Sequence, residues 1–242
     1  MSSKAIIIAG ALCAAVVVAN TGSANAAPIY SNSFFQIYLH LTGPSNFPSG
    51  LVEEDIQLDD AHNVNTVTGT TEDTGKTVEF TSATKLDSAS GAATIKAADN
   101  GVYNDLAISV PGNTFKDLIF TVTLEKPGRD EGPNSLSIEA FGATGSSLGS
   151  FSGFNPTDLE AANNSILILA LAPTLFSSIV LTSPVGIVLA GTGIEQMKQF
   201  QISGVAPVPI PAALPLLASG LGGMGLLSWW RKRKERRQAV AA

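Results

Sequence analysis

Apolar and polar residues alternate along several short stretches of the chain, and this period of two predicts antiparallel β-strands. In the segment 118–124, for example, Phe120 and Val122 alternate with Thr121 and Thr123. Because successive side chains of a strand point to opposite faces, such a segment is expected to be half-buried. Strand patterns of this kind cover the segments 34–41, 64–69, 77–81, 92–96, 106–110, 118–124, 136–140, 179–181, 186–189 and 199–202.

Two segments depart from this alternation. The segment 166–171 is apolar at every position, which predicts a central strand that is either buried on both faces or packed beneath a loop. A single short helix is predicted over 155–162, where Asn155 can cap the N-terminus and Pro156 fits the first helical position. About ten to twelve strands with one short helix predict an all-β fold, an antiparallel β-sandwich.

The C-terminal region has a different pattern. The segment 212–230 holds 19 residues without a charge, and as a helix it would be about 28 Å long, enough to span a bilayer. Tryptophans favour the membrane interface, and Lys and Arg favour the cytoplasmic side. We therefore expect a transmembrane helix followed by a cytoplasmic tail, 231–242, with the body of the protein outside. The residues that stop transfer are Trp229, Trp230, Arg231, Lys232, Arg233, Lys234, Arg236 and Arg237.

A proline-rich segment, 207–211, precedes this span. The order of proline motif, apolar span and basic tail resembles the PEP-CTERM family of bacterial sorting domains, in its VPLPA-CTERM subgroup. The resemblance implies that an exosortase, a membrane-embedded cysteine protease, cleaves near the motif and transfers the protein to the cell surface or releases it. It also implies a jelly-roll-like exported domain. The motif residues are Val208, Pro209, Ile210, Pro211 and Ala212.

Two positions depart from the usual family pattern. Ile210 stands where the subgroup usually has Leu, and no Glu lies between the prolines, as it does in the more common Pro-Glu-Pro form. The second departure leaves open which exosortase subtype would recognise the chain. The alternative interpretation of the same tail is an ordinary single-span anchor that stays uncut.

The N-terminus carries a second targeting signal. Lys4 is followed by an apolar run over 5–19 and by the small residues Ala24 and Ala26, which form a signal peptidase site. We therefore expect a signal peptide, 1–26, and a mature chain that starts at Ala27. The only cysteine, Cys13, leaves with the signal peptide, so no disulfide or cysteine nucleophile is expected in the mature chain.

The net charge of the predicted exported domain, 27–206, excludes one class of partner. Its seven basic and 19 acidic residues give a net charge of −12. Such a surface repels nucleic acid and anionic lipid, so nucleic acid is excluded as a partner.

Candidate chemistry in this domain is sparse. His40 and His62 are the only histidines, and no serine nucleophile elbow, zinc-protease motif or phosphate-binding loop occurs there. We predict no catalytic residue, no cofactor and no metal site. The acidic cluster is expected to be a solvated loop; the alternatives are a glycosidase carboxylate pair or, with Asp130 and Glu131, a Ca²⁺ site. This cluster consists of Glu53, Glu54, Asp55, Asp59 and Asp60.

The aromatic residues of this domain give little evidence for a sugar-binding site, because aromatic side chains usually pack in the core. The domain has no Trp, and its candidates for sugar stacking are Phe34, Phe35, Tyr38, Tyr103, Phe151 and Phe154. The sequence therefore predicts an exported, non-catalytic surface or exopolysaccharide-associated matrix protein. Signal peptidase and exosortase are its expected processing partners. The alternatives are a carbohydrate-binding module, Ca²⁺-dependent or not, and an exported hydrolase.

Overall fold

The computed structural model describes residues 27–40, 53–90, 93–99, 101–124, 136–152, 154, 165–183 and 193–208. These residues form strands and turns, and no helix occurs among them. The prediction of an all-β antiparallel fold is confirmed, whereas the predicted helix over 155–162 and the predicted strand over 186–189 lie outside the described residues. The strands are β1 (Tyr30–Ser31), β2 (Phe35–His40), β3 (Glu54–Leu58), β4 (Ala61–Thr71), β5 (Thr77–Ala89), β6 (Thr94–Ala97), β7 (Asp105–Ser109), β8 (Asn113–Thr114), β9 (Asp117–Leu124), β10 (Ser137–Gly142), β11 (Ser147–Phe151), β12 (Ser165–Ala170), β13 (Phe176–Thr182), β14 (Ile194–Ser203) and β15 (Ala206–Pro207).

Five strands close into a barrel in the order β14, β3, β4, β5 and β6, with β6 returning to β14. Strand β9 pairs along one edge of β14, so β6 and β3 must share the other edge. β6 pairs with Gln196, Met197 and Lys198, and β3 pairs with Gln201 and Ile202. The ladder is therefore interrupted at residues 199 and 200, where Gln199 has a positive φ of 57°.

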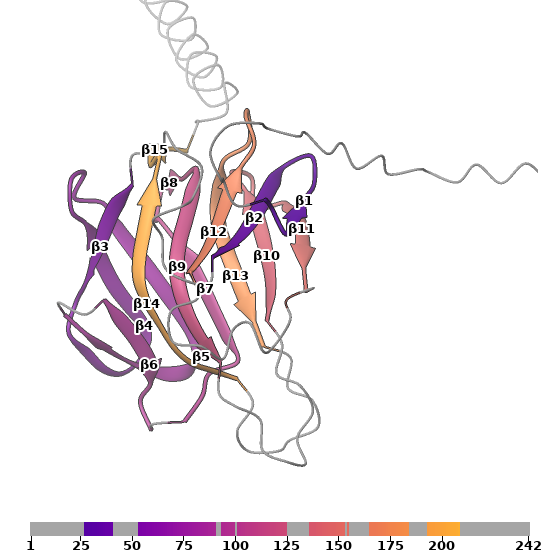
Figure 1. Ribbon diagram of the computed structural model, residues 1–242. Coiled ribbons are helices and arrows are strands. Elements are labelled where there is room, and N and C mark those ends of the chain that lie inside the picture. The colour runs from indigo at the N-terminus through magenta and orange to yellow at the C-terminus, as the bar shows by residue number, and fades with distance from the viewer. Residues whose placement is uncertain are drawn as a thin grey trace, which may run out of the picture.

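Two groups of strands extend the barrel wall into wings. The first wing, β9, β12, β2 and β1, starts from β14, and the second, β7, β13, β10 and β11, starts from β5 (Figure 1). The barrel and both wings are thus parts of one continuous 13-stranded sheet rather than two separate sheets. From β7 to β13 the chain passes repeatedly from one wing to the other, so each wing is completed only by distant segments.

The main core lies inside the barrel and between the wings. Ring contacts join the layers: Phe35 of β2 meets Phe176 of β13 with centroids 6.1 Å apart, and Phe80 of β5 meets Phe200 of β14 at 4.6 Å. All four side chains are almost completely buried. Burial of this apolar surface is the dominant stabilising term for such a fold.

The structure corrects two sequence predictions about burial. Every residue of β9 is buried, so the expected half-buried strand has both faces covered. The acidic loop predicted around Glu54 is instead strand β3, whose buried positions alternate with exposed ones. Ile56 and Leu58 supply the apolar positions of this alternation, which the adjacent carboxylates obscured in the sequence. The segment predicted to be a doubly buried central strand is confirmed as β12, which lies between β2 and β9.

The narrow barrel requires a glycine at one inward-facing position of β4. A Cβ atom at Gly69 would lie 2.8 Å from Ile56 Cγ2 and 3.0 Å from the carbonyl oxygen of Gln57. The second of these atoms belongs to the backbone of β3 and cannot rotate away. The small residue therefore allows β3 and β4 to approach each other in the barrel wall.

We expect Gly69→Ala to lower the free energy of unfolding by about 1–3 kcal/mol, because an added methyl group overpacks the barrel. Urea unfolding of the full chain, followed by circular dichroism, measures this change. Thr70→Val, on the exposed side of the same strand, should change the free energy by no more than about 0.5 kcal/mol. Equal stability of Gly69→Ala and wild type would show that the barrel wall can relax.

Candidate functional site

The structure separates the acidic residues that are adjacent in the sequence. Because Glu54 and Asp55 are neighbours on β3, their side chains point to opposite faces of the sheet. Glu54 is buried, and its Oε2 accepts hydrogen bonds of 2.8 Å from both the backbone N–H and the hydroxyl of Thr74. Asp55 is exposed and accepts a 2.7 Å bond from Gln201 Nε2. The predicted cluster is therefore not a single site.

Glu54 has a structural role at the turn after β4. Burial acts to raise its pKa, but the hydrogen bonds from Thr74 and Thr71 and the backbone N–H of Asp73 outweigh this effect, and the net pKa is lowered. The ionised carboxylate is thus the form that the folded protein favours.

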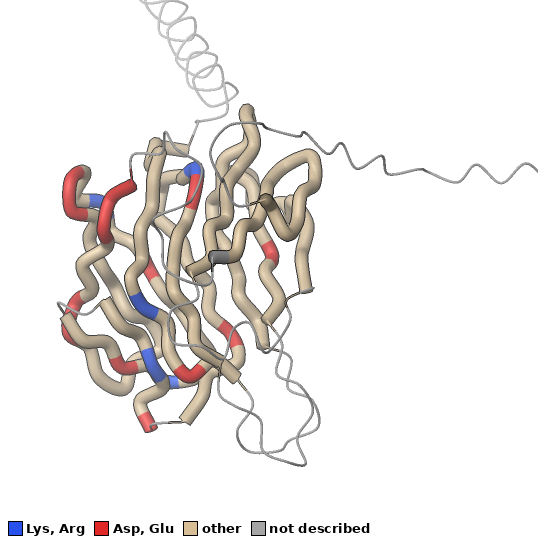
Figure 2. Tube along the Cα trace, viewed as in Figure 1, with Lys and Arg blue, Asp and Glu red and all other residues tan. Residues whose placement is uncertain are grey.

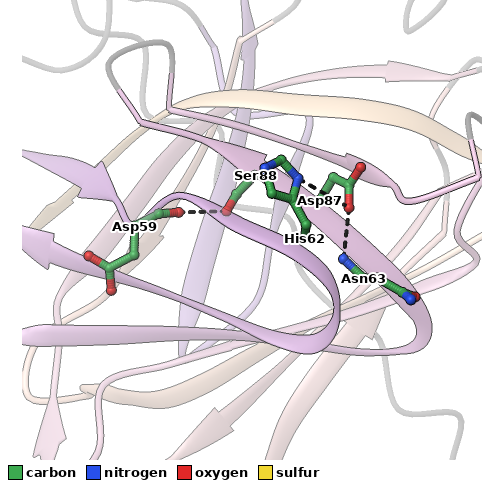
Figure 3. A network of polar contacts seen from close by, with 5 residues as sticks. All are labelled: Asp59, His62, Asn63, Asp87 and Ser88. Atoms are coloured by element: carbon green, nitrogen blue, oxygen red, sulfur yellow. Dashed lines mark hydrogen bonds and ion pairs between the residues drawn. The ribbon is translucent and has the colours of Figure 1, made fainter.

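Asp59 and His62 belong to a corner between β3, β4 and β5 (Figure 3). The hydroxyl of Ser88 donates a 2.6 Å bond to the backbone carbonyl of Asp59. His62 Nδ1 lies 3.8 Å from Asp87 Oδ1, and its side chain is 75% exposed. The backbone N–H of Asn63 donates to the same Asp87 oxygen at 2.8 Å. Because the serine proton is directed at the backbone and not at the imidazole, these contacts hold the corner and do not form a nucleophile–base pair.

Within the part of the chain that the structure describes, no group of three or more His, Cys, Asp or Glu side chains is arranged to hold a metal ion. Asp59 Oδ2 accepts a 2.5 Å bond from Thr68, and Asp60 is exposed. Asp130 and Glu131 lie outside the described residues, so the Ca²⁺ alternative that includes them stays a prediction. His40 lies on β2, opposite Ser165 of β12.

A pocket of about 700 Å³ lies at the barrel closure. Its polar lining comes from β3, β9, β12 and the interrupted part of β14, with one residue each from the segments that follow β4 and β5. Its apolar lining includes Leu58, Ile119 and Phe200. The register explains this assembly, because Gln201 is opposite Asp55 on one side and opposite Ile119 on the other. The polar residues that line it are Asp55, Gln57, Glu72, Ser90, Thr121, Ser165, Gln199 and Gln201.

Hydrogen bonds fix the polar side chains of this pocket. Thr121 Oγ1 donates to Gln199 Oε1 at 3.0 Å, and the hydroxyls of Thr121 and Ser165 lie 3.3 Å apart. Gln201 uses its Nε2 to bind Asp55, whereas its buried Oε1 has no hydrogen-bond partner in the described part of the protein. A buried acceptor without a donor is costly to stability.

Two further carboxyl groups lie close together near the start of β3 and β9. Asp117 is completely buried; its Oδ2 accepts a hydrogen bond from Ser203, and its Oδ1 has no partner among the residues that the structure describes. Burial raises the pKa of Asp117, against the opposing effects of the Ser203 hydrogen bond and the charge of Lys116. Burial also raises the pKa of Glu53, with further increases from the charges of Asp117 and Asp55. Neither Glu53 nor Asp117 is among the residues that line the pocket.

The aromatic candidates form no stacking platform among the described residues. Phe35, Tyr38, Tyr103 and Phe154 are buried, as core packing predicted. Phe151 lies on β11 and packs against Tyr30 and Phe154, with ring centroids 4.9 and 5.0 Å apart. Phe34 alone among the six candidates is largely exposed.

The targeting signals lie mostly outside the described residues. Ala24 and Ala26, the motif residues from Pro209 onward and the basic tail are not described, whereas Ala27 and Val208 are. In the portion of the chain that is described, no helix has the length and apolar character needed to cross a membrane. The expected span, 212–230, falls beyond that portion.

Comparison with known proteins adds no identity to these observations. The chain matches no protein-family model, and a search of curated proteins finds no significant match.

We expect Glu54→Gln to lower the free energy of unfolding at pH 7 by about 1–3 kcal/mol, because the hydrogen bonds to a buried, charged acceptor are replaced by weaker bonds to a neutral amide. The pKa of Glu54 is lowered by folding from 4.5, so its contribution is present above that value and is lost as the pH falls through the folded pKa. Urea unfolding at several pH values measures both effects. Glu195→Gln, an exposed change on β14, is the control, and a pH-independent difference would contradict the assignment.

Asp117→Asn should show the opposite pH dependence. The folded pKa of Asp117 is raised above 3.8, so its favourable contribution is present below 3.8 and is lost as the pH rises through the folded pKa. The stability of Asp117→Asn relative to wild type should therefore increase between about pH 4 and pH 7. Thermal unfolding across this range measures it, with Asp60→Asn as the exposed control. A relative stability that stays constant would contradict a raised pKa.

Proposed function

We propose that the chain is an exported, non-catalytic protein of the cell surface or an exopolysaccharide matrix, and that an exosortase cleaves it at its C-terminal signal. The single observation that carries the proposal is the order of proline motif, uncharged 19-residue span and basic tail in one short segment. An ordinary anchor needs only the span and the charges. The proline string gives a protease an extended, non-helical substrate.

The boundaries of the folded part are consistent with processing at both ends. Strand β1 begins at Tyr30, shortly after the expected signal peptidase site. Strand β15 ends at Pro207, where it pairs with Asn113 of β8, and the N–H of Val208 donates a 3.2 Å bond to Gly112 O. The barrel and both wings therefore lie between the two expected cleavage regions, and cutting there would leave their ladders intact.

The structure separates acidic residues that are adjacent in the sequence, and this separation supports a non-catalytic role for the domain 27–206. A glycosidase requires two carboxyl groups across the scissile bond, one of them a general acid with a raised pKa. The described carboxyl groups whose pKa is raised are Glu53 and Asp117, and neither of them lines the pocket. The pocket carboxylates, Asp55 and Glu72, each accept a bond from a neutral glutamine amide instead.

A jelly-roll-like topology of the two wings is part of the same proposal. The path of the chain supports it, because the strands alternate between the two wings: β9 and β12 belong to one wing, whereas β7, β10, β11 and β13 belong to the other. Repeated crossing between facing layers is the feature that jelly-roll topologies share.

We expect the double change Pro209→Ala and Pro211→Ala to trap a longer, membrane-bound precursor in cells that contain the exosortase, because the cleavage motif is altered while the span is untouched. Membrane fractionation and the intact mass of the product measure this. In the same cells, the wild-type product should lack residues 231–237.

A host without the exosortase is the matched control, since wild type and variant should there accumulate as the same full-length precursor. Wild-type protein that retains residues 231–237 in the membrane of an exosortase-containing host would contradict the proposal. That result would favour the uncut anchor.

A further inference from the structure

We propose that the pocket between β3, β9 and β14 binds a neutral, hydroxyl-rich ligand, such as one or two sugar residues. The proposed function gives the exported body no ligand, so this inference goes beyond it. It rests on the pocket geometry and is independent of how the C-terminal tail is processed.

The size and position of the pocket suit a small ligand. Its volume of about 700 Å³ falls within the usual range for small-molecule sites, about 300–1,000 Å³. It exists because β14 changes partner from β6 to β3 along one edge; Gln199 and Phe200 fall outside both ladders, and the N–H of Gln199 donates to Ala93 O at 3.2 Å. Strands of the barrel and of the first wing hold its walls, so the site is largely preformed.

The hydrogen-bonding groups of the pocket are complementary to hydroxyl groups. Among the described residues, Gln201 Oε1 is buried without a donor, and one of the two N–H groups of its amide is already used by Asp55. Gln199 accepts the proton of Thr121 at its Oε1, so its NH₂ group is directed by that contact and can donate to a ligand. A hydroxyl both donates and accepts, and two neighbouring hydroxyls of a sugar can therefore serve both glutamines.

An apolar surface lies beside these polar groups. Ile119 is 2% exposed and lies opposite Gln201 in the register between β9 and β14. Leu58 and Phe200 continue the apolar lining from the barrel side. A sugar ring has an apolar C–H face and a hydroxyl-bearing edge, and this combination matches the two kinds of wall.

Charge selects against anionic ligands. None of the described lining residues is Lys or Arg, whereas Asp55 and Glu72 are both carboxylates. Lys198 pairs with Thr121 in the ladder but is not one of the lining residues. Figure 2 shows that Asp and Glu are spread over this part of the described chain, with few Lys or Arg. A neutral sugar meets no electrostatic penalty here, and a uronic acid does.

Isothermal titration of the full chain, in a zwitterionic detergent without a sugar headgroup, tests this inference. The probes are the neutral disaccharides maltose, cellobiose and lactose, with digalacturonate as the anionic comparison. We expect saturable binding of at least one neutral probe below about 10 mM and no saturable binding of digalacturonate in that range. A raised unfolding temperature with the same probe should accompany binding.

Two variants locate the site. Gln201→Leu removes the unpartnered acceptor, and Gln199→Gly removes the amide donor while suiting the positive φ of 57° at that position. Each should weaken binding about tenfold or more. Gln196→Leu, on the same strand but outside the lining, should bind like wild type. If Gln201→Leu does not fold, the affinity of Gln199→Gly alone tests the site, because a glycine is compatible with the backbone conformation at position 199.

Three outcomes would overturn the inference: no saturable binding of any neutral probe by wild type, unchanged affinity in the folded pocket variants, or equal binding of digalacturonate. These outcomes are separate from the sorting experiment, which measures the tail in cells. A failed titration would leave exosortase processing in place, and an uncut tail would leave the pocket in place.

Discussion

The division of one edge of β14 between two partners is the constraint on which the rest of the structure depends. β6 pairs with residues 196–198 of β14 and β3 pairs with residues 201 and 202, while β9 pairs along the opposite edge. This arrangement closes the barrel and joins it to the first wing. It also interrupts the ladder at Gln199, where the positive φ re-aims the chain. Closure and pocket thus arise from the same irregularity.

The wings stabilise this closure because their inner faces bury each other. Phe35 and Phe176 pack edge to face across the interior, and the main core runs without a break from the barrel into both wings. No cysteine occurs in 27–206. This part of the chain is therefore stabilised by apolar burial and by the strand ladders, without disulfides. Since the strands of each wing are distant in sequence, folding must close long loops before these contacts form.

Local patterns in the sequence predicted much of the fold, but not the pocket. Strands β9 and β12 could be predicted because alternation and continuous apolar runs are local signals. The carboxylates beside Ile56 hide the alternation in β3, because a run of acidic residues is typical of a solvated loop. The pocket depends on the register that places Asp55, Gln201 and Ile119 side by side, and these residues are far apart in the chain. The burial of Asp117, which raises its pKa, likewise depends on neighbours that only the folded sheet supplies.

The two-residue ladder between β15 and β8 also determines how the protein bears mechanical load. In a chain held at its C-terminal end, drag on the body would pull first on Pro207 and Val208, which pair with β8 and bond to Gly112. Because it has two residue pairs, we expect this short ladder to separate before the tension reaches β14. β14 is clamped along both edges, by β9 on one side and by β6 and β3 on the other. The ladder therefore acts as a small extensible link, which lengthens under tension while the barrel keeps its shape.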